Sequence, residues 1–66
     1  MQVTFYTIHC KACDVLQNRL IEKGVEFETV IDREEMNTLG FTMMPMLIVD
    51  GVIMDFMKAN NWLKSL

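Results

Sequence analysis

The chain has 66 residues, of which 52% are hydrophobic, and its formal net charge is -3. This length allows one domain, residues 1–66, and the apolar content favours a packed core over disorder. Basic and acidic residues are mixed along the chain, and there is no basic block. We therefore do not expect nucleic acid as a partner. We recognise neither a signal peptide nor the roughly 20 apolar residues that span a bilayer, and therefore expect a cytoplasmic protein without a membrane partner.

The first half of the chain predicts a strand, a helix and a second strand. Residues 3–8 are rich in β-branched and aromatic side chains, which indicates a central strand. From Lys11 to Lys23 apolar residues recur at helical spacing, and Gly24 follows as a helix-ending residue. Residues 25–31 alternate apolar and polar side chains. The short connection predicts that the two strands are parallel.

The second half predicts a short helix, a hairpin and a final helix. Residues 32–39 form the short helix, and the continuous apolar run 46–49 predicts a buried strand. Asp50-Gly51 is a strong hairpin signal, with residues 52–54 as the returning strand.

Two aspartates are placed to cap these helices. Asp32, followed by Glu35, resembles a capping box, and Asp55 precedes the last helix. The apolar face of that helix consists of Phe56, Ala59, Leu63 and Leu66, with Trp62 beside it. The expected order is β-α-β-(α)-β-β-α, an α/β chain with a four-stranded mixed sheet flanked by helices.

The only two cysteines form the motif Cys10-Lys11-Ala12-Cys13 where the first strand meets the first helix. A disulfide closing so short a loop stabilises little, so chemistry explains the pair better than structure. The free N–H groups of a helix start lower a cysteine pKa from about 8.5 toward roughly 3.5–7.5. Lys11 and a protonated His9 add positive charge nearby. We therefore predict Cys10 as the nucleophile, with the lower pKa and greater exposure, and Cys13 as the resolving thiol.

Two other interpretations of the cysteines stay open. A structural zinc ion needs about four ligands, and His9 is the remaining candidate besides the two cysteines. His9 is adjacent to Cys10, and adjacent residues rarely bind the same tetrahedral ion. We expect no metal ligand and no tightly bound cofactor within one chain. The dithiols of two chains could still hold a metal or an iron–sulfur cluster, and a redox-silent interaction domain is the third reading. A solvent-facing loop position is the simplest role for His9.

Pro45 is the only proline, and it precedes the buried run 46–49. By frequency alone the peptide bond before it would be trans, since about 5–6% of such bonds are cis. Three of the seven methionines, Met43, Met44 and Met46, surround it. Methionines usually fill hydrophobic cores. The alternative interpretation for these three is an exposed, adaptable surface that binds a protein partner.

These features together resemble the thioredoxin superfamily: a βαβ unit with Cys-x-x-Cys at its first strand–helix junction, then a proline-led hairpin and a helix. The short length is similar to glutaredoxins, and residues 40–49 are similar to NrdH-type redoxins, which donate electrons to ribonucleotide reductase. The resemblance implies a minimal thioredoxin-like fold and a monomer. It implies that Pro45 is cis beside the dithiol and that the Met44 backbone binds a substrate strand or glutathione. Thioredoxin reductase or glutathione would be the reductant.

The chain departs from these families at the site. Lys11-Ala12 is neither the Pro-Tyr of typical glutaredoxins nor the Val-Gln of typical NrdH redoxins. Asp55 and Phe56 stand where glutaredoxins carry a Gly-Gly pair and an acidic pair for glutathione. We therefore expect a thioredoxin-reductase-type flavoenzyme to reduce the protein faster than glutathione. The substrate-binding candidates are His9, Lys11, Met44, Pro45, Asp55 and Phe56.

Overall fold

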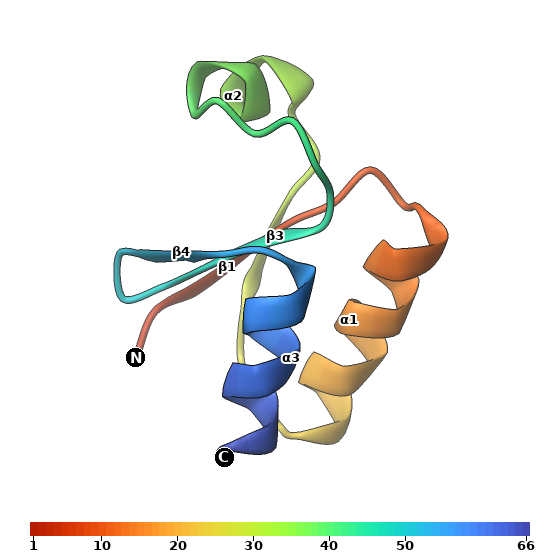
Figure 1. Cartoon of the computed structure of the whole chain (residues 1–66), viewed down its shortest axis with the longest axis vertical. Coiled ribbons are helices and arrows are strands. Elements are labelled where there is room, and N and C mark those ends of the chain that lie inside the picture. The colour runs from red at the N-terminus through yellow and green to blue at the C-terminus, as the bar shows by residue number, and fades with distance from the viewer.

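The first half of the chain folds as a βαβ unit. A computed structural model describes all of residues 1–66 (Figure 1). It contains β1 (Val3–Tyr6), α1 (Lys11–Glu22) and β2 (Glu28–Val30) in that order. β1 and β2 are parallel, with Phe5 paired to Thr29, as the short connection predicted. The helix ends at Glu22, and Gly24, two residues later, has a φ of 69° in the left-handed region that glycine adopts without strain.

Both strands of this unit are shorter than the sequence predicted. β1 stops at Tyr6, and Ile8 is 41% exposed in the following loop. β2 covers three residues of the predicted 25–31, and Ile31 is 60% exposed. β2 lies at the edge of the sheet and pairs with β1 alone, so the four residues of β1 limit its length. Val25 and Phe27 still pack against the core, but from the loop before β2.

The second half adds α2 (Arg33–Thr38), β3 (Met46–Val49), β4 (Val52–Met54) and α3 (Phe56–Lys64). β3 and β4 form the predicted hairpin, and its turn residues Asp50 and Gly51 have φ values of 48° and 83°. Positive φ at both positions is what a two-residue type I′ turn requires. The last helix ends two residues earlier than expected. Leu66 lies beyond it and is 54% exposed, so Leu66 is not part of the apolar face.

The four strands form one mixed sheet in the order β2-β1-β3-β4. Figure 1 shows α1 and α3 side by side, with α2 set apart from them. The main core lies between α1, α3 and the sheet. Its buried members are Val3, Phe5, Cys13, Leu16, Leu20, Leu47, Val49, Ala59 and Leu63. The predicted α/β architecture is therefore correct, and one of the two cysteines belongs to the core.

The helices are short. The longest, α1, has 12 residues, and none of the three is both long and apolar enough to cross a membrane.

Candidate active site

Cys10 is the N-cap of α1. Its backbone is extended, with φ of -76° and ψ of 170°, and its sulfur accepts the Cys13 N–H at 3.1 Å. The Asp14 N–H donates to the Cys10 carbonyl at 3.0 Å and starts the helix. Cys10 is partly exposed, whereas Cys13 is fully buried one turn further on. Both are free thiols. The expectation that Cys10 is the more exposed cysteine is confirmed.

A tight turn between β1 and α1 presents this cap. The Thr7 N–H donates to the Val30 carbonyl at 3.1 Å and continues the pairing of β1 with β2. Its hydroxyl oxygen accepts the His9 N–H at 3.0 Å, a local bond typical of threonine in turns. His9 has a φ of 60°, in the left-handed region. The chain thus changes direction within three residues and delivers Cys10 to the helix start.

The buried thiol of Cys13 has several hydrogen-bond partners. Burial raises its pKa, but hydrogen bonds from the side chains of Cys10 and Thr7 outweigh this effect. A backbone hydrogen bond at Ile8 acts in the same direction, and the Cys13 pKa lies below its ordinary value. Cys13 is therefore the position where negative charge is best accommodated.

Cys10 shifts in the opposite direction. The hydrogen bond with the Cys13 side chain, together with burial, raises the pKa of Cys10. The backbone N–H groups of Cys13 and Ala12 lower it, but by less. The sequence predicted that Cys10 would have the lower pKa, and the geometry reverses this order. The reason is the turn after β1, where Thr7 and Ile8 add donors to the deeper sulfur.

The sheet brings the Pro45 segment to the same end of the molecule as the dithiol. β1 and β3 are antiparallel, and Tyr6 at the end of β1 pairs with Met46 at the start of β3. Consequently the turn before Cys10 and the residues before Met46 leave the same edge of the sheet. Pro45 is buried and Met44 packs against the core. The Met44–Pro45 peptide bond is cis, as the resemblance implied and against the frequency of such bonds.

The remaining candidates have local structural roles. Asp55 is the N-cap of α3, and its carboxylate accepts the Lys58 N–H at 2.8 Å. Phe56 packs against the core. His9 and Lys11 are exposed on either side of Cys10. Contact of any of these four residues with a substrate stays a prediction.

A small hollow adjoins the site on the α2 side. Its volume is about 230 Å³, and it is lined by Ile8, Arg33, Met36, Asn37, Phe41, Thr42 and Met44. Ile8 belongs to the turn before Cys10 and Met44 precedes Pro45, although neither cysteine lines the hollow. Four of its seven lining residues are hydrophobic.

Thr7 is the residue of this site that the sequence did not single out. It is fully buried, bonds the His9 backbone and contributes to the low pKa of Cys13. The one available signal was a threonine two residues before His9, a spacing at which threonine closes a turn. As for metals, no group of three or more His, Cys, Asp or Glu side chains could hold an ion. A dithiol supplies two of the four ligands of a typical site, so a second chain would have to supply the others.

Comparison with protein-family models and with curated proteins gives no match. Among solved structures, the fold is similar to the glutathione S-transferase from Ascaris lumbricoides, with a TM-score of 0.74 and 21% sequence identity. The match covers 96% of this chain and 34% of that one, so the chain spans about a third of the transferase. At this identity the likeness establishes the fold, which is thioredoxin-like.

Proposed function

We propose that this protein is a thiol–disulfide oxidoreductase that reduces protein disulfides through Cys10 and Cys13. The observation that carries the proposal is the capping geometry: a partly exposed sulfur at a helix start, backed by a buried thiol one turn away. A thiolate attacks disulfides, and a second thiol within reach completes the exchange. We place the protein with the glutaredoxin-like redoxins, with ribonucleotide reductase as the leading target.

The first step forms a mixed disulfide. Cys10 Sγ attacks one sulfur of the substrate disulfide, the substrate S–S bond breaks, and the other substrate sulfur leaves as a thiolate. The Cys10 proton moves along the S–H···S hydrogen bond to Cys13, whose lowered pKa suits it to exist as the thiolate that accepts it. Cys13 therefore serves as the base for Cys10, while Thr7 and the Ile8 backbone hold the charge on Cys13 beforehand.

The second step releases the substrate. Cys13 passes its proton to the departing thiolate and attacks Cys10 Sγ. The Cys10–substrate bond breaks, and the second substrate sulfur leaves as a thiolate that takes its proton from solvent water. The substrate gains two electrons and two protons, and the protein becomes a Cys10–Cys13 disulfide. One helical turn sets Cα atoms about 5 Å apart, within the range for a disulfide. An external reductant then restores the dithiol.

The surroundings of the site favour a polypeptide over glutathione as the substrate. Glutathione carries carboxylates at both ends and has no large apolar side chain. Four of the seven residues that line the hollow are hydrophobic, and its one charged residue, Arg33, is surrounded along the chain by Asp32, Glu34 and Glu35. Exposed Met43 adds apolar surface to the segment before Pro45. A partly apolar hollow in an acidic setting suits an apolar side chain of a protein substrate better than a dianionic tripeptide.

Glutathione is the second candidate, as reductant or substrate. The structural neighbour is named for its use of glutathione, and exposed Lys11 beside Cys10 could pair with a carboxylate. These two observations justify testing it directly against a flavoenzyme. We expect thioredoxin reductase to reduce the Cys10–Cys13 disulfide faster than millimolar glutathione does.

Two measurements test the proposal. Stopped-flow reduction of the oxidised protein by thioredoxin reductase with NADPH, and by glutathione, compares the reductants. Rapid reduction by glutathione alone would make the protein a glutathione-dependent glutaredoxin. In the second measurement, Cys13→Ser is mixed with a disulfide-bearing protein and should accumulate a mixed disulfide visible by mass spectrometry. Turnover by Cys13→Ser at the wild-type rate would exclude the two-cysteine mechanism, and the Cys10→Ser variant is the matched control that forms no adduct.

A further inference from the structure

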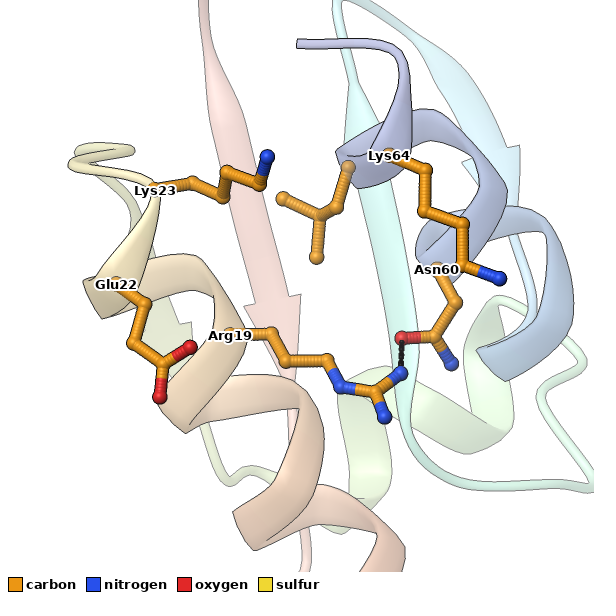
Figure 2. A pocket seen from close by; sticks show the side chains of 6 residues that line it. Arg19, Glu22, Lys23, Asn60 and Lys64 are labelled. Atoms are coloured by element: carbon orange, nitrogen blue, oxygen red, sulfur yellow. Dashed lines mark hydrogen bonds between the residues drawn. The ribbon is translucent and has the colours of Figure 1, made fainter.

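A second hollow lies at the other end of α1. Its volume is about 280 Å³, and it is lined by Arg19, Glu22, Lys23, Asn60, Leu63 and Lys64 (Figure 2). These residues belong to the last turns of α1 and α3 and to the residue that ends α1. A 12-residue helix is about 18 Å long at 1.5 Å per residue, so the hollow is well separated from the dithiol. None of its residues takes part in the redox chemistry proposed above.

Arg19 is held in place by a buried side chain. The Asn60 Oδ1 accepts a hydrogen bond from the Arg19 Nη1, which the dashed line in Figure 2 marks. The Asn60 Nδ2 donates in turn to the Phe56 carbonyl at 2.9 Å, and Asn60 is only 9% exposed. A guanidinium has five N–H donors, so four remain beyond the bond to Asn60. A fixed guanidinium loses less entropy when it binds a further group than a freely moving one does.

The hollow is positive although the chain is negative. Three of the six basic residues line it, with Glu22 as the one acid, which gives a local charge of +2 in a chain of net charge -3. Cations near the C-terminal end of a helix also interact favourably with the helix dipole, and Arg19 and Lys64 lie in the last turns of α1 and α3. A freely moving, exposed lysine can interact with the helix dipole in this way without being held in place. It does not require three cations around one hollow, nor a buried asparagine that orients one of them.

We propose that this hollow binds the phosphate group of a small phosphomonoester. The planar fork of Arg19 matches two oxygens of a phosphate, and Lys23 and Lys64 supply two further charges for a dianion. The volume exceeds what a phosphate group fills, which leaves space for the organic part beside Leu63. Carboxylates of single charge would engage the arginine but leave the lysines without a partner.

The test is a titration followed by ¹H–¹⁵N backbone amide shifts. The probes are glucose 6-phosphate and inorganic phosphate, each compared with sodium chloride at the same ionic strength. We expect saturable shifts for residues 19–23 and 60–64, with tighter binding of the ester than of free phosphate. The double variant Lys23→Gln/Lys64→Gln should weaken binding at least about tenfold, or about 1.4 kcal/mol, because it removes two of the three positive charges that line the hollow.

The double variant Lys11→Gln/Lys58→Gln is the matched control, since it removes the same charge from cations outside the hollow. It should leave the affinity within about twofold of wild type, as expected for screened charges at a distance. Both double variants change exposed side chains, so both should fold. Shifts equal to those with sodium chloride, or equal weakening in the two double variants, would overturn the proposal. Tighter binding of inorganic phosphate would keep the site but assign it to the free ion.

Discussion

The starts of α1 and α3 use the same geometry with different atoms. Cys10 and Asp55 both have extended backbones and both accept the N–H three residues later. At α1 the acceptor is a sulfur at 3.1 Å, and at α3 it is a carboxylate oxygen at 2.8 Å. Aspartate is among the best capping residues, whereas a thiol is a weak acceptor. Two helices of one small protein therefore begin with a strong cap and a weak one.

The difference indicates what each helix start is for. Asp55 satisfies a backbone donor and fixes where α3 begins. Cys10 satisfies the same kind of donor less well, yet it places a sulfur where backbone N–H groups and a neighbouring thiol act on its charge. The weak cap fits the chemical role that we propose for the sulfur. Substitutions that exchange these properties between the two helix starts test this interpretation.

The largest effect is expected from Cys10→Ser. Serine is a good cap, so the free energy of unfolding of the reduced protein should stay the same or rise by up to about 1 kcal/mol. Disulfide reductase activity should fall to background, because a hydroxyl does not exchange with disulfides. Insulin reduction and urea unfolding under reducing conditions measure the two properties. A loss of stability comparable to removing a cap would show that the sulfur is needed for folding.

The next largest effect is expected from Thr7→Val, which keeps the shape of the side chain and removes its hydroxyl. The pKa of Cys13 should rise, because the hydrogen bond from Thr7 that lowers it is lost. The rate of disulfide attack at neutral pH should fall about tenfold, the effect of roughly 1.4 kcal/mol, and the pH–rate profile should move to higher pH. Thr7→Ser keeps the hydroxyl and is the control. An unchanged profile in Thr7→Val would remove Thr7 from the mechanism.

A smaller effect, on stability, is expected from Asp55→Ala. Losing the cap should lower the free energy of unfolding by about 1 kcal/mol, which corresponds to a fall in melting temperature of about 4–8 °C for a domain of this size. Asp55→Ser restores an acceptor and should recover most of the loss. Equal destabilisation by alanine and serine would mean that the Asp55 carboxylate acts through something other than the Lys58 N–H.

The smallest effect is the pH dependence of stability in the reduced protein. The folded pKa of Cys13 is lowered, so its contribution is present above the unfolded pKa and is lost as the pH falls through the folded pKa. The folded pKa of Cys10 is raised, so its contribution is present below the unfolded pKa and is lost as the pH rises through the folded pKa.

The difference in unfolding free energy between wild type and Cys10→Ser/Cys13→Ser should therefore peak near the ordinary pKa of cysteine. Urea unfolding across a pH series, with a phosphine reductant present, measures it. A difference that rises steadily with pH would mean that both thiols ionise more readily in the folded state.

Signals that depend on a few neighbouring residues were enough to predict much of the fold. Asp32 caps α2 by accepting the N–H groups of Glu34 and Glu35, as expected. Asp50 and Gly51 form the hairpin turn, and Gly24 follows α1. Strand lengths were less predictable, because a strand extends only as far as its partner. Ile8 and Ile31 have strand-like side chains but find no neighbouring strand to pair with.

The sequence by itself determined the position of the dithiol at a strand–helix junction, the order of the elements and the caps, because each depends on chemistry within one or two helical turns. The tertiary structure decided which cysteine carries the lower pKa, because the donors to Cys13 come from Thr7 and Ile8, which the turn after β1 folds back over the start of α1. It also decided that Arg19 meets Asn60, 41 residues away, at the far end of α1. Local spacing fixes which groups a helix presents, whereas the charge on a buried sulfur depends on donors that only packing brings within reach.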